Sequence, residues 1–269
     1  MKIGIMQGRL LKPETNHIQS FPKNNWEKEF KIANKNKIRL IEWIVDRKNI
    51  LKNPINTKKG RSKIKKLKKI YKIQIESLTA DFFLQKPFTI DKKNKNEFYI
   101  FRKTLENCAK INIKFFIVPL LETASLKKKD EKFFISKMKR LTNILKKNKQ
   151  IILFETDLSL YKIQKLLSSL PKELFGINFD TGNSLDCGYS QTDIKKIIKF
   201  THNIHLKDKN NKLLTVKLGD GLFNFKNFFK LLKNEKYEKN LILQTARTTS
   251  NQVYNILTNK RFVEKFLKI

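Results

Sequence analysis

The feature of this sequence that most constrains its fold is the alternation of short apolar segments with longer, amphipathic, lysine-rich segments. The apolar segments begin roughly 25 to 40 residues apart, which suits a strand, a loop and a returning helix. Eight such units predict one α/β domain over residues 1–269, a (β/α)₈ TIM barrel with parallel strands. The predicted strand segments are Ile3–Met6, Leu40–Val45, Ile73–Asp81, Phe115–Glu122, Ile151–Asp157, Phe175–Gly182, Asn203–Asp208 and Leu241–Ala246.

The segments between the predicted strands have the pattern of helices that cover a barrel. In "NWEKEFKIANKN", Trp26, Phe30 and Ala33 fall on one helical face, and Asn24 or Asn25 is the candidate N-cap. The 269 residues fit the usual size of such a barrel, and no proline-rich or glycine-serine linker divides them. The pattern therefore favours a single domain.

The formal net charge of +35 suggests, at first, a polyanionic partner. The excess is mostly lysine, however, and runs such as Lys63–Lys69 and Leu145–Lys149 have the spacing of solvated helix faces. The charge is not accompanied by a zinc finger, an aromatic ribonucleoprotein motif or a compact arginine cluster. We therefore do not expect nucleic acid as a partner.

The cysteines and the first residues indicate the cellular setting. Cys108 and Cys187 are far apart and have no partners at metal-ligand spacing, which indicates a reducing compartment or indifference to redox. In "MKIGIMQGRL", Gly, Gln and Arg interrupt the apolar run, so this segment is neither a signal peptide nor a membrane anchor. We expect a cytoplasmic protein without a membrane partner, and the sequence leaves a homo-oligomer open.

Polar residues at the ends of the predicted strands are the candidates for chemistry, because the active site of a TIM barrel lies at the C-terminal ends of its strands. Glu155, Asp180 and His205 end three consecutive predicted strands, and Gln244 ends the next. Two carboxylates and an imidazole are suitable ligands for Mn²⁺, Mg²⁺, Co²⁺ or Zn²⁺. Solubility of the barrel mouth also requires polar residues, and His205 alone would be explained equally well as a core histidine. Together they predict a divalent-metal site.

Further polar residues near the strand ends predict a polyhydroxylated small-molecule ligand, with or without a phosphate group. Trp43 offers an apolar face for a sugar ring, and Gly219 and Gly221 would let the backbone approach a ligand closely. In so basic a chain, ordinary surface charge also explains the lysines. The predicted substrate-binding residues are Gln7, Arg9, Trp43, Asn183, Lys207, Asp208, Lys209 and Arg247.

Over nearly its whole length the sequence resembles the sugar phosphate isomerase/epimerase family, which has the xylose isomerase-like TIM barrel. The resemblance rests on the order and spacing of several motifs, each only moderately specific by itself. They are "IGIMQGRL" at the start, "IQSFP" followed by Trp26, "LIEWIVD" from Leu40, "NFDTGNS" from Asn178, "HLKDK" from His205 and "LGDGLFNF" from Leu218.

The resemblance implies a metal held by residues on strands five to eight. The family typically uses Glu, Asp, His and Glu there, and the matching positions are Glu155, Asp180, His205 and Gln244. Gln244 departs from the pattern: its amide oxygen can coordinate a cation, but it cannot act as a general base. The family's two-glutamate epimerisation is thereby put in doubt, whereas an aldose–ketose isomerisation needs only one base, for which Glu155 is the candidate.

Several functions remain open at this stage. The leading hypothesis is a divalent-metal-dependent isomerase or epimerase of a sugar or sugar phosphate, acting through an enediolate. The alternatives are a catalytically inactive sugar-binding barrel and a related metal-dependent dehydratase or lyase. An apurinic-site endonuclease shares the barrel but uses a three-metal, histidine-rich cluster, and three histidines are too few for it.

Overall fold

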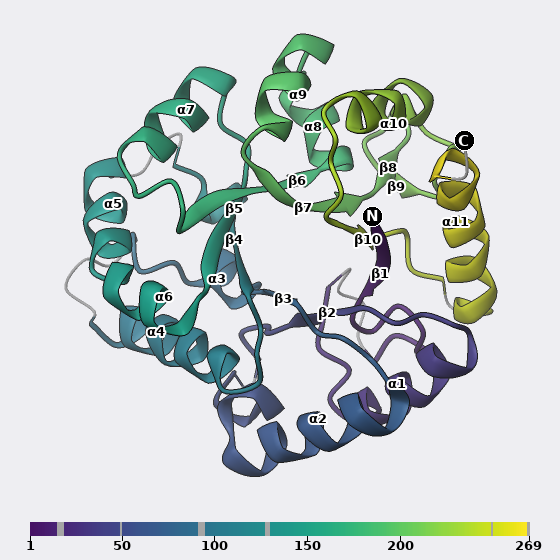
Figure 1. Ribbon diagram of the computed structural model, residues 1–269, viewed down its shortest axis with the longest axis horizontal. Coiled ribbons are helices and arrows are strands. Elements are labelled where there is room, and N and C mark those ends of the chain that lie inside the picture. The colour runs from purple at the N-terminus through teal and green to yellow at the C-terminus, as the bar shows by residue number, and fades with distance from the viewer. Residues whose placement is uncertain (15–18, 49, 91–94, 127–129, 249, 268–269) are drawn as a thin grey trace.

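The computed structural model is a closed barrel of parallel strands surrounded by helices (Figure 1), and it confirms the predicted fold class. It describes residues 1–14, 19–48, 50–90, 95–126, 130–248 and 250–267, so Ile18 of the "IQSFP" motif lies outside the described residues. The barrel order is β1-β10-β7-β6-β5-β4-β3-β2, closed by pairing of β1 with β2. These strands are β1 (Lys2–Met6), β2 (Ile41–Ile44), β3 (Ser77–Thr79), β4 (Phe115–Leu120), β5 (Ile151–Thr156), β6 (Phe175–Asp180), β7 (Thr201–Leu206) and β10 (Asn240–Leu243).

Each predicted apolar segment overlaps one barrel strand, although β1, β7 and β10 begin one or two residues earlier and the third strand is shorter than its segment. Of Ile73–Asp81, only Ser77–Thr79 is strand, and Gln74 forms an isolated bridge with Leu40. A two-stranded antiparallel sheet, β8 (Asp208–Lys209) with β9 (Thr215–Val216), follows β7 at the barrel mouth. The strand ends therefore meet at one mouth, as the sequence predicts.

Helices form the outer layer of the barrel (Figure 1). They are α1 (Trp26–Lys35), α2 (Lys58–Tyr71), α3 (Phe82–Gln85), α4 (Lys95–Ala109), α5 (Glu131–Lys139), α6 (Thr142–Asn148), α7 (Leu160–Ser168), α8 (Thr181–Cys187), α9 (Gln191–Ile198), α10 (Phe225–Asn234) and α11 (Gln252–Leu267). Short 3₁₀ helices are η1 (Ile50–Lys52), η2 (Pro54–Asn56) and η3 (Glu122–Ala124). Among the described residues, none of the helices combines the length and apolar character needed to span a bilayer.

The first helix shows how the outer layer packs. Trp26, Phe30 and Ala33 of α1 are buried, as predicted, because they share the face that covers the barrel. Asn25 occupies the N-cap position, but its side chain makes no capping hydrogen bond; its amide instead donates to Glu14 at 3.3 Å. This helix is therefore positioned by its apolar face.

Side chains alternate along each strand between the helix layer and the barrel interior. In β2, Trp43 faces the helices, and its ring centroid lies 5.5 Å from those of Phe21 and Trp26. Its neighbours in sequence, Glu42 and Ile44, face the interior instead. The interior also includes a small apolar cluster of Met6, Leu40, Ile44 and Ile242.

Candidate active site

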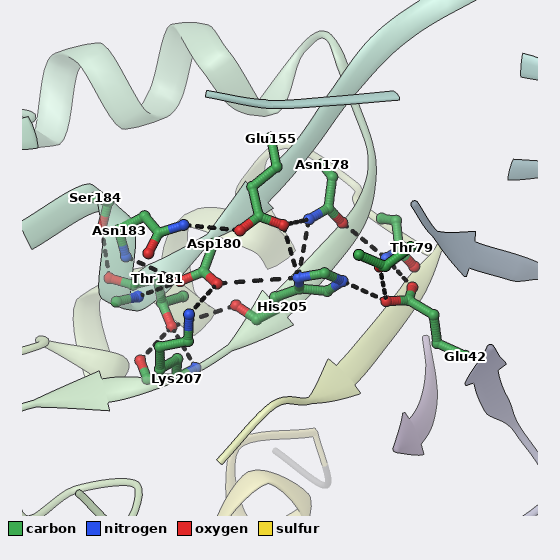
Figure 2. Close-up of polar contacts among 12 residues, drawn as sticks. Glu42, Thr79, Glu155, Asn178, Asp180, Thr181, Asn183, Ser184, His205 and Lys207 are labelled. Atoms are coloured by element: carbon green, nitrogen blue, oxygen red, sulfur yellow. Dashed lines mark hydrogen bonds and ion pairs between the residues drawn. The ribbon is translucent and has the colours of Figure 1, made fainter. Parts of the chain in front are cut away.

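Three ionisable side chains converge at the mouth end of the barrel interior. Glu155 of β5, Asp180 of β6 and His205 of β7 are all buried, and one potential ligand atom from each lies within 4.8 Å of the others (Figure 2). They come from adjacent strands, and the register pairs Asp180 with His205 directly. The parallel pairing therefore brings together three residues that are far apart in the chain.

Local structure fixes the orientation of Asp180. It is the N-cap of α8, and its Oδ1 accepts hydrogen bonds from the backbone N–H of Gly182 at 2.8 Å and of Asn183 at 2.9 Å. Its Oδ2 lies 2.9 Å from Nζ of Lys207. Burial opposes ionisation of Asp180, but Lys207 and His205 outweigh it and hold its pKa below the usual range. Asp180 is therefore a fixed carboxylate.

His205 lies between carboxylates on both sides. Its Nε2 is 2.6 Å from Oε1 of Glu42, and its Nδ1 is 3.0 Å from Oε2 of Glu155 and 3.0 Å from Nδ2 of Asn178 (Figure 2). Burial alone would lower the pKa of His205, but Glu42 and Glu155 raise it to about 10. Without a cation, the imidazole is therefore protonated, and a metal at Nδ1 would replace that proton.

Glu42 belongs to the site, although the sequence interpretation left it out of the predicted site residues. Its carboxylate is fully buried and accepts hydrogen bonds from Ser77 at 2.6 Å, Thr79 at 2.9 Å and Asn203 at 2.9 Å. Burial opposes its charge, but His205 and these hydroxyls outweigh that effect and lower its pKa. The signal in the sequence was an acidic residue inside the otherwise apolar segment "LIEWIV" of a basic chain.

Gln244 follows β10, the strand that pairs with β7. It lies two residues after Ile242, which faces the interior, so the strand alternation directs Gln244 to the same side. Its Oε1 is buried and has no hydrogen-bond partner among the described residues. An unpaired buried amide oxygen is costly, and coordination of a cation would satisfy it. An amide oxygen added to the two carboxylates and the imidazole of Glu155, Asp180 and His205 would give a donor set that fits a divalent metal.

A cavity of about 710 Å³ lies at the strand ends beside Glu155. Glu155 lines it, as do three of the predicted substrate-binding residues, Asn183, Lys207 and Lys209. Asn183 donates to Oε1 of Glu155 at 2.8 Å, and Lys209 pairs with Asp186. The cavity is large enough for a small, polar molecule, and it places such a molecule next to Glu155.

Two predicted substrate-binding residues have other roles. Trp43 is 0% exposed in the core beneath α1, and its Nε1 donates to Asn53 at 3.1 Å, so the expectation that it faces a sugar ring is wrong. The strand alternation sends Trp43 outward because Glu42 occupies the inward position. Asp208 is also buried, and it anchors a loop of this chain.

The "LGDG" loop is folded around Asp208. Its carboxylate accepts backbone N–H bonds from Gly219 at 3.0 Å, Gly221 at 3.0 Å and Phe223 at 3.1 Å. A Cβ on Gly221 would lie 2.3 Å from Oδ1 of Asp208. The close approach that this glycine permits is therefore to Asp208, and the expectation that it admits a ligand is not met.

Gln7, Arg9 and Arg247 gather where β1 and β10 end, but they do not line the 710 Å³ cavity. Gln7 accepts from the backbone N–H of Ile44 at 3.2 Å, and Arg9 donates from Nε to the carbonyl of Thr245 at 3.1 Å. Arg247 donates to the carbonyl of Gly8 at 3.2 Å. In this structure, Arg9 and Arg247 connect the ends of β1 and β10, and Gln7 connects the ends of β1 and β2.

Comparison with known proteins agrees with this architecture. A family model described as xylose isomerase-like TIM barrel matches residues 30–265, whereas no curated protein sequence matches significantly. The IOLI protein, solved with a binding zinc atom, has a TM-score of 0.77 at 14% identity, with 99% of both chains covered.

Two further solved structures have the same fold. A D-tagatose 3-epimerase-like protein has a TM-score of 0.75 at 16% identity, covering 100% of this chain and 97% of its own. The 3-keto-D-glucoside 4-epimerase YcjR from E. coli has a TM-score of 0.71 at 13% identity, covering 98% of this chain and 99% of its own. Since the family model spans most of the sequence, this chain belongs to the xylose isomerase-like TIM barrel family.

Proposed function

We propose that the protein is a divalent-metal-dependent enzyme that isomerises or epimerises a small sugar or sugar phosphate by moving a proton next to a carbonyl group. The observation that carries this proposal is the convergence of Glu155, Asp180 and His205 within 4.8 Å of one another, with Glu155 also lining a 710 Å³ cavity. Solved structures of the same fold support it: several are sugar epimerases, and one, from Methylomonas sp., contains D-allulose.

In this proposal, Glu155, Asp180, His205 and Gln244 hold the metal. A bound divalent cation would supply Lewis-acid stabilisation of negative charge on a sugar oxygen. Glu155 lines the cavity and is also one of the three metal-binding candidates. Its carboxylate is therefore the base that removes the proton next to the carbonyl group of the sugar. Asn183, through its hydrogen bond to Oε1, orients Glu155.

Lys207 and Lys209 give the cavity wall positive charge, which suits an anionic sugar. Both lysines are already paired, with Asp180 and Asp186 respectively. The positive charge favours a sugar phosphate, whereas the existing ion pairs of both lysines favour a neutral sugar, so we propose these two ligand classes. Competition by inorganic phosphate would indicate a sugar phosphate, and its absence would indicate a neutral sugar.

The first experiment is the metal content of the purified protein by elemental mass spectrometry, beside His205→Ala as the matched variant. We expect near-stoichiometric manganese, cobalt, zinc or magnesium in the wild type and loss of the metal in the variant. No metal after reconstitution of the wild type would overturn the metal-dependent mechanism and favour the inactive sugar-binding barrel.

The second experiment tests proton abstraction directly. D-Fructose and D-allulose are incubated in D₂O with the manganese-loaded protein, and deuterium at carbon is read by NMR. We expect deuterium incorporation in the wild type and a loss of about 10²-fold or more in Glu155→Gln. Equal incorporation in both proteins would contradict the role of Glu155.

A further inference from the structure

A second acidic residue lines the same cavity as Glu155. Asp81 lies two residues after the end of β3 and directly before α3, whereas Glu155 lies on β5, so the two reach the cavity from separate strand ends. Asp81 is only 8% exposed, and it makes no side-chain cap for α3. Helix capping therefore does not explain why an acidic residue is buried at this position.

The surroundings of Asp81 are unusual for a buried acid. Within the described residues, no hydrogen bond or ion pair reaches its carboxyl group, and its charged neighbours are the acidic residues Asp46, Glu122 and Glu155. Burial, followed by these three carboxylates, raises the pKa of Asp81 to about 7. At neutral pH the group can therefore both hold and release a proton, as a general acid must.

The other acids in the cavity lining are less suitable. Asp186 pairs with Lys209, and Asp157 accepts a hydrogen bond from Ser125 at 2.8 Å. Glu122 is exposed. Gln244, at the position where the family carries a second carboxylate, has no titratable proton at neutral pH. Asp81 is thus the buried acid of the cavity that is free to take part in proton transfer.

We propose that Asp81 is the second proton-transfer residue of this enzyme, working with Glu155 in the epimerisation of a sugar at the carbon next to its carbonyl group. This inference rests on the proposed function. Glu155 takes the proton from that carbon, and the C–H electron pair forms the enediolate. The carboxylic acid of Asp81 then gives its own proton to the other face of the same carbon. Glu155 ends protonated and Asp81 ionised, and proton exchange with solvent restores both.

The test separates proton removal from proton return. D-Fructose and D-allulose differ only in configuration at C3, next to the carbonyl, so manganese-loaded protein in D₂O is assayed for deuterium at C3 and for the other sugar. In Asp81→Asn, we expect deuterium incorporation into the starting sugar within about threefold of wild type, because Glu155 can return a solvent-exchanged proton to the same face. We expect formation of the epimer to fall by about 10²-fold.

The matched control is Glu173→Gln, which removes an exposed acid outside the cavity lining and should retain epimer formation. Melting temperature and metal content verify that each variant is folded and loaded.

An unchanged ratio of epimer to incorporated deuterium in Asp81→Asn would overturn the role of Asp81. Loss of both epimer formation and deuterium incorporation in a folded, metal-loaded Asp81→Asn variant would also overturn it. Incorporation without any epimer in the wild type would overturn it too while leaving the proposed function intact. No incorporation in the wild type would overturn both.

A readout independent of activity uses the metal-free protein. With carboxyl-¹³C-labelled aspartate, the resonance that is missing from Asp81→Asn identifies Asp81, and its shift is followed against pH. We expect a midpoint near 7. A midpoint near the ordinary aspartate value of 3.8 would leave Asp81 without a proton to donate at neutral pH and would overturn the proposal.

Discussion

Nε2 of His205 lies 2.6 Å from Oε1 of Glu42 in the fully buried interior of the barrel. This contact joins β7 to β2, which are not neighbours in the sheet, across the interior. It occupies one ring nitrogen and leaves Nδ1 directed to Glu155, the side where the metal ligands gather. Glu42 therefore determines which nitrogen of His205 is available for coordination.

Glu42→Gln should weaken divalent-metal binding by about 10- to 100-fold, because it removes the charged partner that orients and polarises His205. Calorimetric titration of Mn²⁺ into the metal-free protein measures this. The matched control is Glu76→Gln, which removes a carboxylate from the Lys2 and Asn240 contacts of the barrel and should leave the affinity unchanged. Equal affinities for Glu42→Gln and wild type would restrict Glu42 to a role in core stability.

Gln244→Glu should tighten Mn²⁺ binding, because a carboxylate at this position adds one negative charge to the ligand set. The amide oxygen of Gln244 has no hydrogen-bond partner among the described residues, so the exchange breaks no hydrogen bond to that oxygen there. The same calorimetric titration compares the two proteins. A weaker affinity in the variant would show that Gln244 is not a ligand.

Asp81→Asn should stabilise the fold at pH 8 by up to about 4 kcal/mol and have little effect near pH 4. Burial and three acidic neighbours raise the pKa of Asp81 from 3.8 to about 7. The folded state therefore binds this proton more tightly than the unfolded state, and the stability that it contributes is lost as pH rises through 7. Urea denaturation at the two pH values measures the difference.

The control for that prediction is Asp186→Asn, which removes an exposed carboxylate paired with Lys209 and should give no gain at pH 8. The same stability difference at both pH values would contradict the raised pKa of Asp81. A gain confined to high pH would mean that this acid is kept at the cavity at a cost in stability, as is common for functional residues.

Asp208→Ala should lower the free energy of unfolding by about 3 kcal/mol, because the backbone N–H groups of Gly219, Gly221 and Phe223 lose their acceptor. Urea denaturation measures it. Asp220→Ala, an exposed change in the same loop, should stay within about 0.5 kcal/mol of wild type. A comparable loss in the two variants would indicate that the loop does not depend on Asp208.

The sequence by itself determined the barrel and the approximate place of its site. The alternation of apolar strands and amphipathic helices is local and periodic, so it can be recognised without knowing which segments meet. The position of Glu155, Asp180 and His205 at consecutive strand ends then followed from the rule that parallel strands present their ends at one mouth.

The tertiary structure decided the direction and partners of individual side chains. A shift of one residue along a strand turns a side chain from the interior to the helix layer, and this is why Glu42 joined the site while Trp43 entered the core. Likewise, only the folded chain shows that Asp208 is enclosed by its own loop and that Asp81 stands among acids without a counter-ion in the described residues. Burial and contacts between distant segments set these properties, and neither is encoded in local sequence.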